Sequence, residues 1–572
     1  MSAEHISAEH LSGEQLSAGI AFHRPRSFWF GTVAIGLGAI LHLPMFVMGV
    51  RNGKMLSGMG WDPWMIIGMA LIVGGLGAVA FGVGFRSTPR VEPRAADLEF
   101  KALDGSGLSR AHVTLMLAMT VAIAIDTLKP FTFTFILPGV AVEYNLSSAS
   151  HAAPGQWPVA LWPFLAIFGT VVGSLVWGHI ADRVGRRATI MFIAAMFMAT
   201  SVCGAMPAVQ WNLLMCFLMG FSVGGLLPIA YSLLTEIIPV RRRGQLVVLV
   251  AGFGTALGFI LASWAANWLI PPFGWRIMWF LGVPSGLALI LLNRHIPESP
   301  RFLLATGRRS EAHAVMRRFG IVATEKKAEA LAAPDQAEAQ SEPRPTAGDV
   351  FRSPYRGITV SLTVFGLAWG LANFGFLVWL PVYVAKSGID TGTVTAIMAK
   401  AALFSIPGSL LFAWLYGRIG SRLTLVAAAG LTTVTMGVFT AFGETLPQHT
   451  TLFTGMVIVL LVSLWASISV LAPYSAEVYP TAIRAVGSGT TAGASKLGGV
   501  FALGLSVAAV APPAIGGSAL LAAVPAALAA LMLLVFGIET RDRSLEEITS
   551  PQIARLRPRE LTPESIPSGV SP

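Results

Sequence analysis

Residues Gly178–Arg187 read GHIADRVGRR, a short polar segment between two apolar runs at roughly 158–181 and 188–208. Each run has about the ~20 apolar residues that a helix needs to cross a bilayer. Because the segment between them is so short, it predicts two antiparallel helices that lie side by side. Its arginines place it on the cytoplasmic side, since short cytoplasmic loops collect Lys and Arg. This stretch therefore sets the orientation of every other predicted span.

The composition is that of a polytopic membrane protein. The chain has 572 residues, of which 54% are hydrophobic and 12% charged, against about 25% charged residues in a soluble domain. The net charge of +10 does not indicate a nucleic-acid surface, because most of the 39 lysines and arginines fall in predicted cytoplasmic segments. The two cysteines, Cys203 and Cys216, lie in apolar helices and indicate neither a disulfide framework nor a zinc site.

The apolar runs predict an all-α protein of about fourteen transmembrane helices in a two-plus-six-plus-six order. An amphipathic helix is expected over Arg309–Phe319, and no cleaved signal peptide is expected. The predicted segments are a cytoplasmic tail with a pentapeptide repeat (1–26), an extra transmembrane hairpin (27–85), a cytoplasmic linker (86–110), a first six-helix half (111–294), a cytoplasmic central loop (295–356), a second six-helix half (357–540) and a cytoplasmic tail (541–572). The hairpin holds small residues suited to close helix packing, such as Gly74, Gly75 and Gly77. Whether it docks on its own chain, dimerises or binds a partner stays open.

The two sets of six helices are repeats of each other. The pattern ExxPxxxR at 236–243 recurs at 477–484, and RxGxR at 183–187 recurs at 418–422. Glu298 and Glu539 are separated by the same interval as the two ExxPxxxR patterns. Several coincidences at helix ends indicate a duplication, and in transporters built from such repeats the substrate site lies between them near the middle of the membrane.

The opening stretch resembles the signature loop between the second and third helices of the major facilitator superfamily (MFS), and the resemblance covers about 110–545. It implies a transporter whose helix-end charges pair when the cytoplasmic side is shut, as in the sugar porter and metabolite:proton symporter branches. Charge that merely sets topology is the alternative reading. Gly417 stands where the first half has Asp182, so a gate there is expected to be asymmetric. The candidate gating residues are Gly178, Asp182, Arg183, Gly185, Arg186, Arg187, Glu236, Arg243, Glu298, Arg301, Glu477, Arg484 and Glu539.

Asp126 and Lys129 are charged residues in the middle of an apolar run, a position that marks a functional candidate. Their i, i+3 spacing brings them near enough to pair, and Pro130 removes the helical partner of the Asp126 carbonyl. The alternative is a neutralised pair that only locks two helices together. The stretch AIDTLKPFTFTFILPG resembles the first helix of aromatic-acid:proton symporters, with Lys129 in place of their second acid. Cys216 stands where sugar porters carry an arginine.

The second half offers three further candidates. Lys496 lies midway along its helix, in GASKLGG, where relatives that move organic ions often carry arginine; a lysine that extends to the interface is the alternative. Trp369 and Asn373 lie one turn apart, where related transporters place polar substrate contacts, and core packing is their alternative role.

The sequence thus predicts an MFS transporter in the inner or plasma membrane, with both termini in the cytoplasm, acting as a monomer by alternating access. The favoured function is proton-coupled uptake of a small organic anion, with Asp126 as proton acceptor and Lys129 and Lys496 as substrate contacts. An uncoupled facilitator, an exporter and a transporter-like sensor are the alternatives. No Walker A loop, nucleophile elbow or metal-binding histidine pair stands out, so we expect no enzyme activity, no cofactor and no metal.

Overall fold

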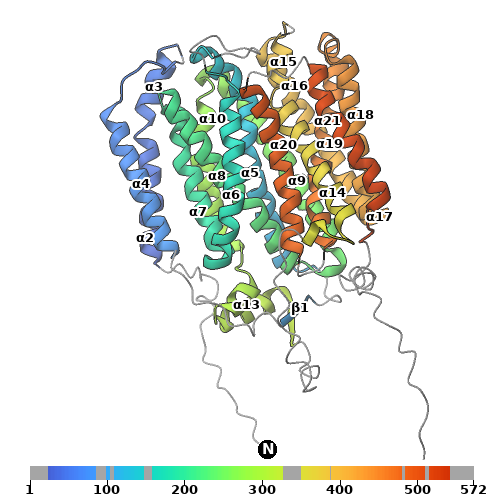
Figure 1. Cartoon of the computed structure of the whole chain (residues 1–572). Coiled ribbons are helices and arrows are strands. Elements are labelled where there is room, and N and C mark those ends of the chain that lie inside the picture. The colour runs from blue at the N-terminus through green and yellow to red at the C-terminus, as the bar shows by residue number, and fades with distance from the viewer. Residues whose placement is uncertain are drawn as a thin grey trace, which may run out of the picture.

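Long helices standing side by side make up the molecule (Figure 1). A computed structural model of the chain describes residues 24–53, 55–84, 98–102, 108–146, 157–325, 349–386, 388–479, 483–508 and 515–540. We call the end that carries α13 (Arg309–Phe319) the lower end. The opposite end, where α5 (Arg110–Glu143) finishes, is the upper end.

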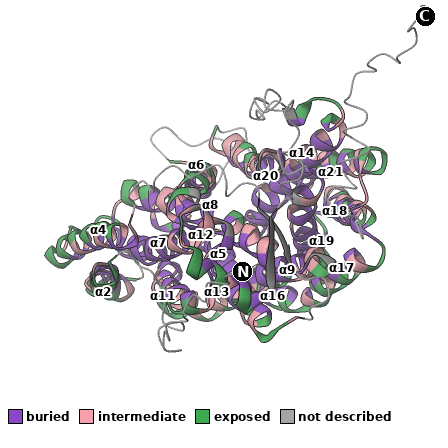
Figure 2. Cartoon of the chain, turned by 90° about the horizontal axis from the view of Figure 1, so that it is seen from below, coloured by how far each residue is buried: buried purple, intermediate pink, exposed green. Residues whose placement is uncertain are grey.

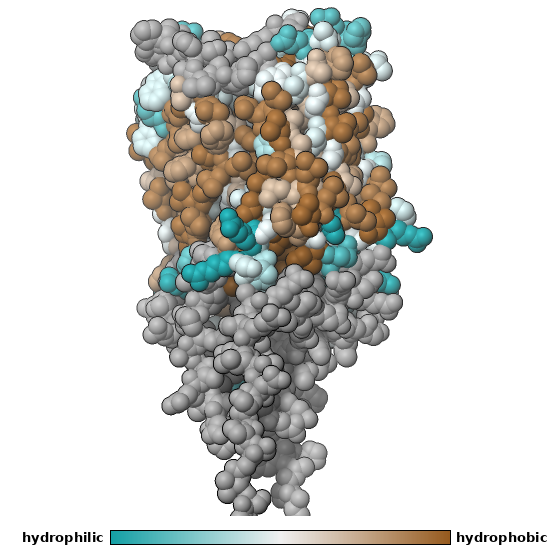
Figure 3. Space-filling view, turned by 45° about the vertical axis from the view of Figure 1, so that its right-hand side comes forward, coloured by the Kyte–Doolittle hydropathy of each residue, from teal (hydrophilic) through white to brown (hydrophobic). Residues whose placement is uncertain are grey.

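The helices are built to cross a membrane. Within the described ranges, 13 helices are long and apolar enough to do so. A further helix, α20 (Arg484–Val507), has 24 residues and is therefore about 36 Å long, although Gly, Ser and Thr make it less apolar. On the face shown in Figure 3, hydrophobic residues cover the middle of the bundle, and hydrophilic residues gather above and below them. The protein is a multi-pass membrane protein with about fourteen transmembrane helices, as predicted.

The predicted hairpin is present and packs on its own chain. It consists of α2 (Pro25–Ile40), α3 (Leu43–Arg51) and α4 (Pro63–Val83). Asp62 caps α4 by accepting a hydrogen bond from Trp64 N at 2.9 Å. A Cβ on Gly31 would lie 2.5 Å from the carbonyl oxygen of Gly75, so small residues let α2 and α4 touch along their backbones. Gly74 and Gly77 have no such neighbour within 4 Å.

Six spans form what we call the first half. Its helices pair closely as α5 with α9, α6 with α8 and α7 with α11. The elements are α5, α6 (Leu161–Val184), α7 (Arg186–Ala199) with the 3₁₀ turn η2 (Thr200–Ala205), α8 (Val209–Ile237), α9 (Val240–Phe273), and α10 (Ile277–Phe280) followed by α11 (Gly282–Leu292) and the 3₁₀ turn η3 (Asn293–His295). The hairpin packs through α2 and α4 on α7, and through α3 on η2. Figure 2 shows it beside α7 on the outer side of the bundle.

The second half has the same number of spans. The elements of the second half are α14 (Arg356–Gly370) continued by the π-helix η7 (Leu371–Leu377) and α15 (Leu380–Lys386), then α16 (Thr391–Phe404), α17 (Ile406–Arg418), α18 (Ser421–Phe442), the 3₁₀ turn η8 (Leu446–Gln448), α19 (Thr450–Glu477), α20 and α21 (Ile515–Phe536). One span in each half is formed by two consecutive helices, α10 with α11 in the first half and α16 with α17 in the second. Across the boundary between the halves, α9 packs on α16, α17 and α19, and α6 packs on α20.

The lower end carries a small group of elements. The predicted amphipathic helix is confirmed as α13, and its Phe319 ring lies 5.2 Å from the ring of His112 on α5. Between α11 and α14 lie also α12 (Pro300–Ala305) and the 3₁₀ turn η6 (Asp349–Phe351). The sequence did not predict the antiparallel pair of β1 (Leu98–Ala102) and β2 (Ile321–Glu325), which joins the linker before α5 to the chain after α13.

Candidate functional site

Two ionisable side chains, one from each half, approach each other inside the bundle. Asp126 on α5 is 1% exposed, and its Oδ1 has no hydrogen-bond partner among the described residues. It interacts electrostatically with Lys496 on α20, although the two side chains do not form a direct ion pair. Tyr231 on α8 also interacts electrostatically with Asp126. Because α5 and α20 belong to different halves, any movement of one half against the other changes this interaction.

Lys129 faces a different environment. It is 2% exposed, and its Nζ, which has no hydrogen-bond partner within the described ranges, lies 5.8 Å from the ring centre of Phe197 on α7. A Cβ on Gly282 of α11 would collide with Nζ. The i, i+3 spacing predicted that Lys129 pairs with Asp126, and the structure does not show this pair. Lys129 points into the first half, toward the helices behind α5.

Trp369 and Asn373 differ in what their polar atoms contact. The Trp369 indole donates a hydrogen bond to the Leu464 carbonyl on α19 at 2.8 Å, which fixes α14 against α19. Asn373 lies in the π-helix η7, is 1% exposed, and has an Oδ1 without a hydrogen-bond partner in the described chain. Short π-helical segments occur frequently at functional sites. Trp369 is thus engaged in packing, whereas Asn373 offers a free acceptor.

The duplicated turns at the lower end have the same construction in both halves. Gly185 has φ +106° and Gly420 has φ +100°, values that favour glycine and let the chain reverse between two helices. In the first half Glu298 accepts hydrogen bonds from Arg186 N at 2.9 Å and Arg187 N at 3.2 Å. In the second half Glu539 accepts hydrogen bonds from the corresponding backbone groups, Ser421 N at 2.8 Å and Arg422 N at 3.3 Å. Each glutamate therefore caps the helix that follows the turn.

Burial affects the ionisation of the first of these glutamates. It raises the pKa of Glu298, and the backbone N–H groups that the carboxyl accepts from oppose the rise. Beside it, Arg186 forms an ion pair with Glu236 at 2.5 Å, and Ser299 Oγ donates to the same carboxylate at 2.6 Å. Arg187 Nε donates to Asn293 Oδ1 at 2.6 Å. All these contacts join helices of the first half to one another or to the start of the central loop, and none of them reaches the second half.

Contacts between the halves at the lower end centre on Glu477, the last residue of α19. Its carboxylate accepts hydrogen bonds from the Tyr416 hydroxyl and Thr540 Oγ1, both at 2.7 Å. It interacts electrostatically with Arg243 of α9, and a Cβ on Gly244 would lie 2.7 Å from its Oε1. The lower ends of the two halves are therefore in contact.

Gly417 forms a second contact of this kind. A Cβ there would lie 3.0 Å from the carboxamide carbon of Gln245 on α9. The residue that replaces the first half's aspartate thus sits directly against the opposite half.

Other members of the predicted gating set are less informative. Gly178 on α6 faces open space, since a Cβ there would have no described atom within 4 Å. Arg183 is exposed. The side chains of Asp182, Arg301 and Arg484 lie outside the described part of the structure.

Sequence reasoning missed Glu143 and assigned no role to Arg276. They form an ion pair at 2.7 Å with both side chains 3% exposed. Glu143 ends an apolar run and Arg276 begins one. Charged residues are common at the ends of membrane spans, so these two positions do not stand out in the sequence. Their burial could not be read from their positions in the sequence.

Comparison with known proteins identifies the family. The model of the Major Facilitator Superfamily matches residues 114–503. The niacin transporter NiaP of Acinetobacter baylyi is 28% identical over 402 residues, which cover 69% of this chain and 86% of the relative. The putative niacin/nicotinamide transporter NiaP of Bacillus subtilis is 26% identical over 424 residues, covering 74% of this chain and 94% of the relative.

Solved structures agree in fold. The proton:xylose symporter XylE bound to 6-bromo-6-deoxy-D-glucose superimposes with a TM-score of 0.60 at 19% identity, covering 77% of this chain and 99% of that one. At this level of identity the likeness shows the fold alone. With the duplicated turns, the two six-helix halves and a family match over most of its length, the chain belongs to the major facilitator superfamily of membrane transporters.

Proposed function

We propose that the protein carries a small organic anion across the bilayer together with a proton, by alternating access between its two halves. The observation that carries this proposal is that Asp126 and Lys496, one ionisable group from each half, interact electrostatically inside the bundle. Charged residues inside a membrane bundle are costly and mark ion or substrate pathways. A pair that spans the boundary between halves is also the pair that a rocking movement makes or breaks.

The chemistry follows from competition for one ammonium group. While Asp126 is ionised, it holds Lys496 by charge attraction. When Asp126 takes up a proton, Lys496 loses its counter-charge and becomes available to a substrate carboxylate. Proton and anion then travel together without net charge, and release of both restores the Asp126–Lys496 interaction. Asn373 supplies an acceptor for a substrate N–H or O–H group. Lys129, which faces α7 and α11, has no part in this proposal.

Relatives favour the same class of substrate. One of them is named a niacin transporter and another a putative niacin/nicotinamide transporter, and niacin is a carboxylic acid on an aromatic ring. An aromatic monocarboxylate is therefore the first substrate to test.

The lower end is proposed to be cytoplasmic, because its connecting segments carry most of the basic residues. Both termini then lie in the cytoplasm, and the contacts of Glu477 with Arg243 and Gly244 form the inner gate. We propose that the protein works in this way as a monomer in the inner membrane.

The test uses purified protein in liposomes that contain a pH-sensitive dye. External nicotinate is expected to acidify the lumen, whereas xylose and choline at equal concentration leave it unchanged. Asp126→Asn should abolish acidification, and Lys496→Gln should abolish nicotinate uptake. Uptake of labelled nicotinate without any pH change would identify a facilitator instead. Binding of nicotinate without uptake would identify a sensor.

A further inference from the structure

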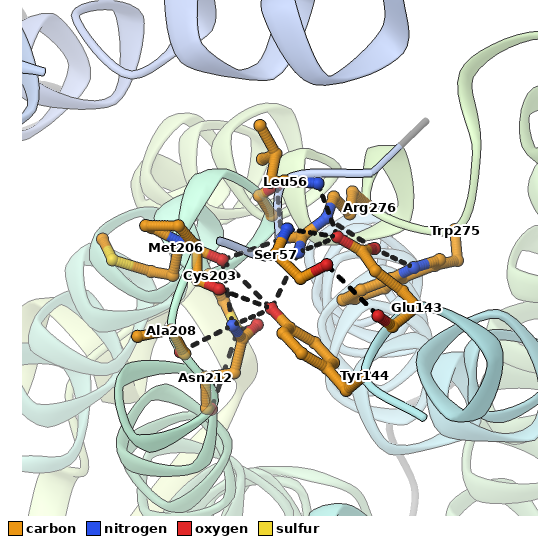
Figure 4. A network of polar contacts seen from close by, with 12 residues as sticks. Leu56, Ser57, Glu143, Tyr144, Cys203, Met206, Ala208, Asn212, Trp275 and Arg276 are labelled. Atoms are coloured by element: carbon orange, nitrogen blue, oxygen red, sulfur yellow. Dashed lines mark hydrogen bonds and ion pairs between the residues drawn. The ribbon is translucent and has the colours of Figure 1, made fainter. Parts of the chain in front are cut away.

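The loop between α3 and α4 is bound to the upper end of α5. Backbone N–H groups of Leu56 and Ser57 donate hydrogen bonds to Glu143 Oε1 at 2.6 and 3.0 Å, and Ser57 Oγ donates to the Glu143 carbonyl at 3.2 Å. Figure 4 shows these groups gathered around Glu143, with the two N–H groups on its carboxylate and the hydroxyl on its carbonyl. Leu56 itself is fully buried. The extra hairpin therefore reaches the first helix of the transporter through its loop.

The same carboxylate also binds the turn between α9 and α10. Arg276 donates to it twice, from Nη2 to Oε1 at 2.7 Å and from Nε to Oε2 at 3.0 Å. The Trp275 indole adds a third bond to Oε2 at 2.9 Å. Glu143 thus receives hydrogen bonds from two segments that lie on either side of α5 in the sequence.

Arg276 extends the network to η2 and α8 (Figure 4). It donates to the Met206 carbonyl at 2.9 Å and to the Tyr144 hydroxyl at 2.7 Å. Asn212 at the start of α8 donates to the same hydroxyl at 2.9 Å. The donors and acceptors of a buried, bidentate ion pair are therefore satisfied by groups from four segments.

Apolar contacts support the same docking of the hairpin. The rings of Phe46 on α3 and Phe280 on α10 have centroids 5.0 Å apart, and those of Trp61 and Trp211 are 5.5 Å apart in an edge-to-face arrangement. These contacts lie on elements of the first half. Together with the loop, they attach the hairpin along one side of that half.

We propose that the hairpin is a fixed part of the first half and that Glu143 is the positioning residue that fastens it to α5. Hairpin, α5 and the α9–α10 turn then move as one body when the second half moves. Asp126 lies 17 residues before Glu143 on the same helix, about 25 Å along its axis at 1.5 Å per residue. The fastening therefore acts on the helix that carries Asp126, at the end beyond Pro130 and Pro138.

The test measures a distance in the full-length protein and needs no substrate, so its outcome is independent of the proposed function. Spin labels are placed at Ile67 on α4 and at Leu214 on α8, which are 48% and 42% exposed. Pulsed electron–electron double resonance between the two labels, in lipid nanodiscs, should give one narrow distance distribution. Glu143→Gln should broaden or shift it, because the carboxamide presents N–H groups to donors. The matched control, Glu444→Gln, neutralises an exposed carboxylate near the same end and should leave the distribution unchanged.

A second variant covers the case in which Glu143→Gln does not fold. Ser57→Pro removes both hydrogen bonds that Ser57 donates to Glu143, one from its N–H and one from its hydroxyl. It leaves Glu143 and Arg276 paired, so it should broaden the distribution by a smaller amount. A distribution that is already broad in the parent protein would overturn the proposal, because the hairpin would then not be fixed. A distribution unchanged by either variant would overturn it as well, because the loop contact would then not hold the hairpin.

Discussion

Replacing Gly244 by alanine is expected to open the lower end of the transporter. A Cβ at this position would lie 2.7 Å from Glu477 Oε1 and 2.9 Å from Tyr416 Cε1. Glu477 cannot move aside freely, because its Oε2 accepts hydrogen bonds from the Tyr416 hydroxyl and Thr540 Oγ1. Gly244 lies on α9 of the first half, whereas the groups it would strike belong to the second half. The added methyl group therefore crowds the molecule only while the lower ends are together.

The magnitude follows from that difference. Overpacking a well-packed contact costs about 1–3 kcal/mol. Alanine also stabilises a helix by about 1 kcal/mol relative to glycine. This gain is the same in the closed and the open conformation, so it does not change the ratio of their populations. The population with a closed lower end should therefore fall relative to the open one by about 5–150-fold.

The assay reads the separation of the halves at the lower end. Spin labels at His179 on α6 and Leu423 on α18, both exposed, report short and long distances for the closed and open states. Gly437→Ala on α18 is the matched control, since nothing lies within 4 Å of a Cβ there. If Gly244→Ala changed the ratio of the two populations no more than this control does, the contact between α9 and Glu477 would not hold the lower end shut.

Three further predictions concern buried charges. Asp126→Asn and Lys496→Gln should each lower the melting temperature in detergent. The double variant should lose less stability than the sum of the two single losses, by about 0.5–3 kcal/mol. If the two single losses simply add in the double variant, the two groups do not interact. Lys129→Met should stabilise the protein by about 1–3 kcal/mol, because a buried amine without a hydrogen-bond partner is removed, and a lower melting temperature would show that Nζ has a partner in the membrane-embedded protein. The pKa of Glu298 is raised by burial, so the native state binds more protons than the unfolded state and this group's contribution is lost as pH rises through the native pKa. The melting temperature of Glu298→Gln should therefore rise relative to the wild type from acidic to neutral pH, and the opposite trend would mean that the ionised carboxylate is the stabilising form.

Local sequence signals predicted the spans and the duplicated turns. An apolar run of sufficient length defines a membrane helix without knowledge of its neighbours. Gly185 and Gly420 were found through their spacing, and the structure explains that spacing by a positive φ followed by a helix whose first N–H groups need an acceptor. Glu298 and Glu539, which the repeat singled out, supply that acceptor.

Directions and distant partners could not be predicted in the same way. Three residues of α-helix turn the side-chain direction by about 300°, so Asp126 and Lys129 point about 60° apart. That angle is enough for one to face the second half while the other faces Phe197 and Gly282. Glu143 receives its hydrogen bonds from groups 87 and 133 residues away, and no local pattern encodes such pairings.

The position of the hairpin at the start of the chain has a consequence for biosynthesis. Segments of a protein enter the membrane in the order in which they are made, with N-terminal parts first. When Glu143 leaves the ribosome, Leu56 and Ser57 have already been synthesised, whereas Arg276 has yet to be translated. The hairpin can therefore supply the first hydrogen bonds to a carboxylate that would otherwise wait unpaired for its counter-charge. In this order of synthesis, the hairpin is the first of the two partners of Glu143 to be made.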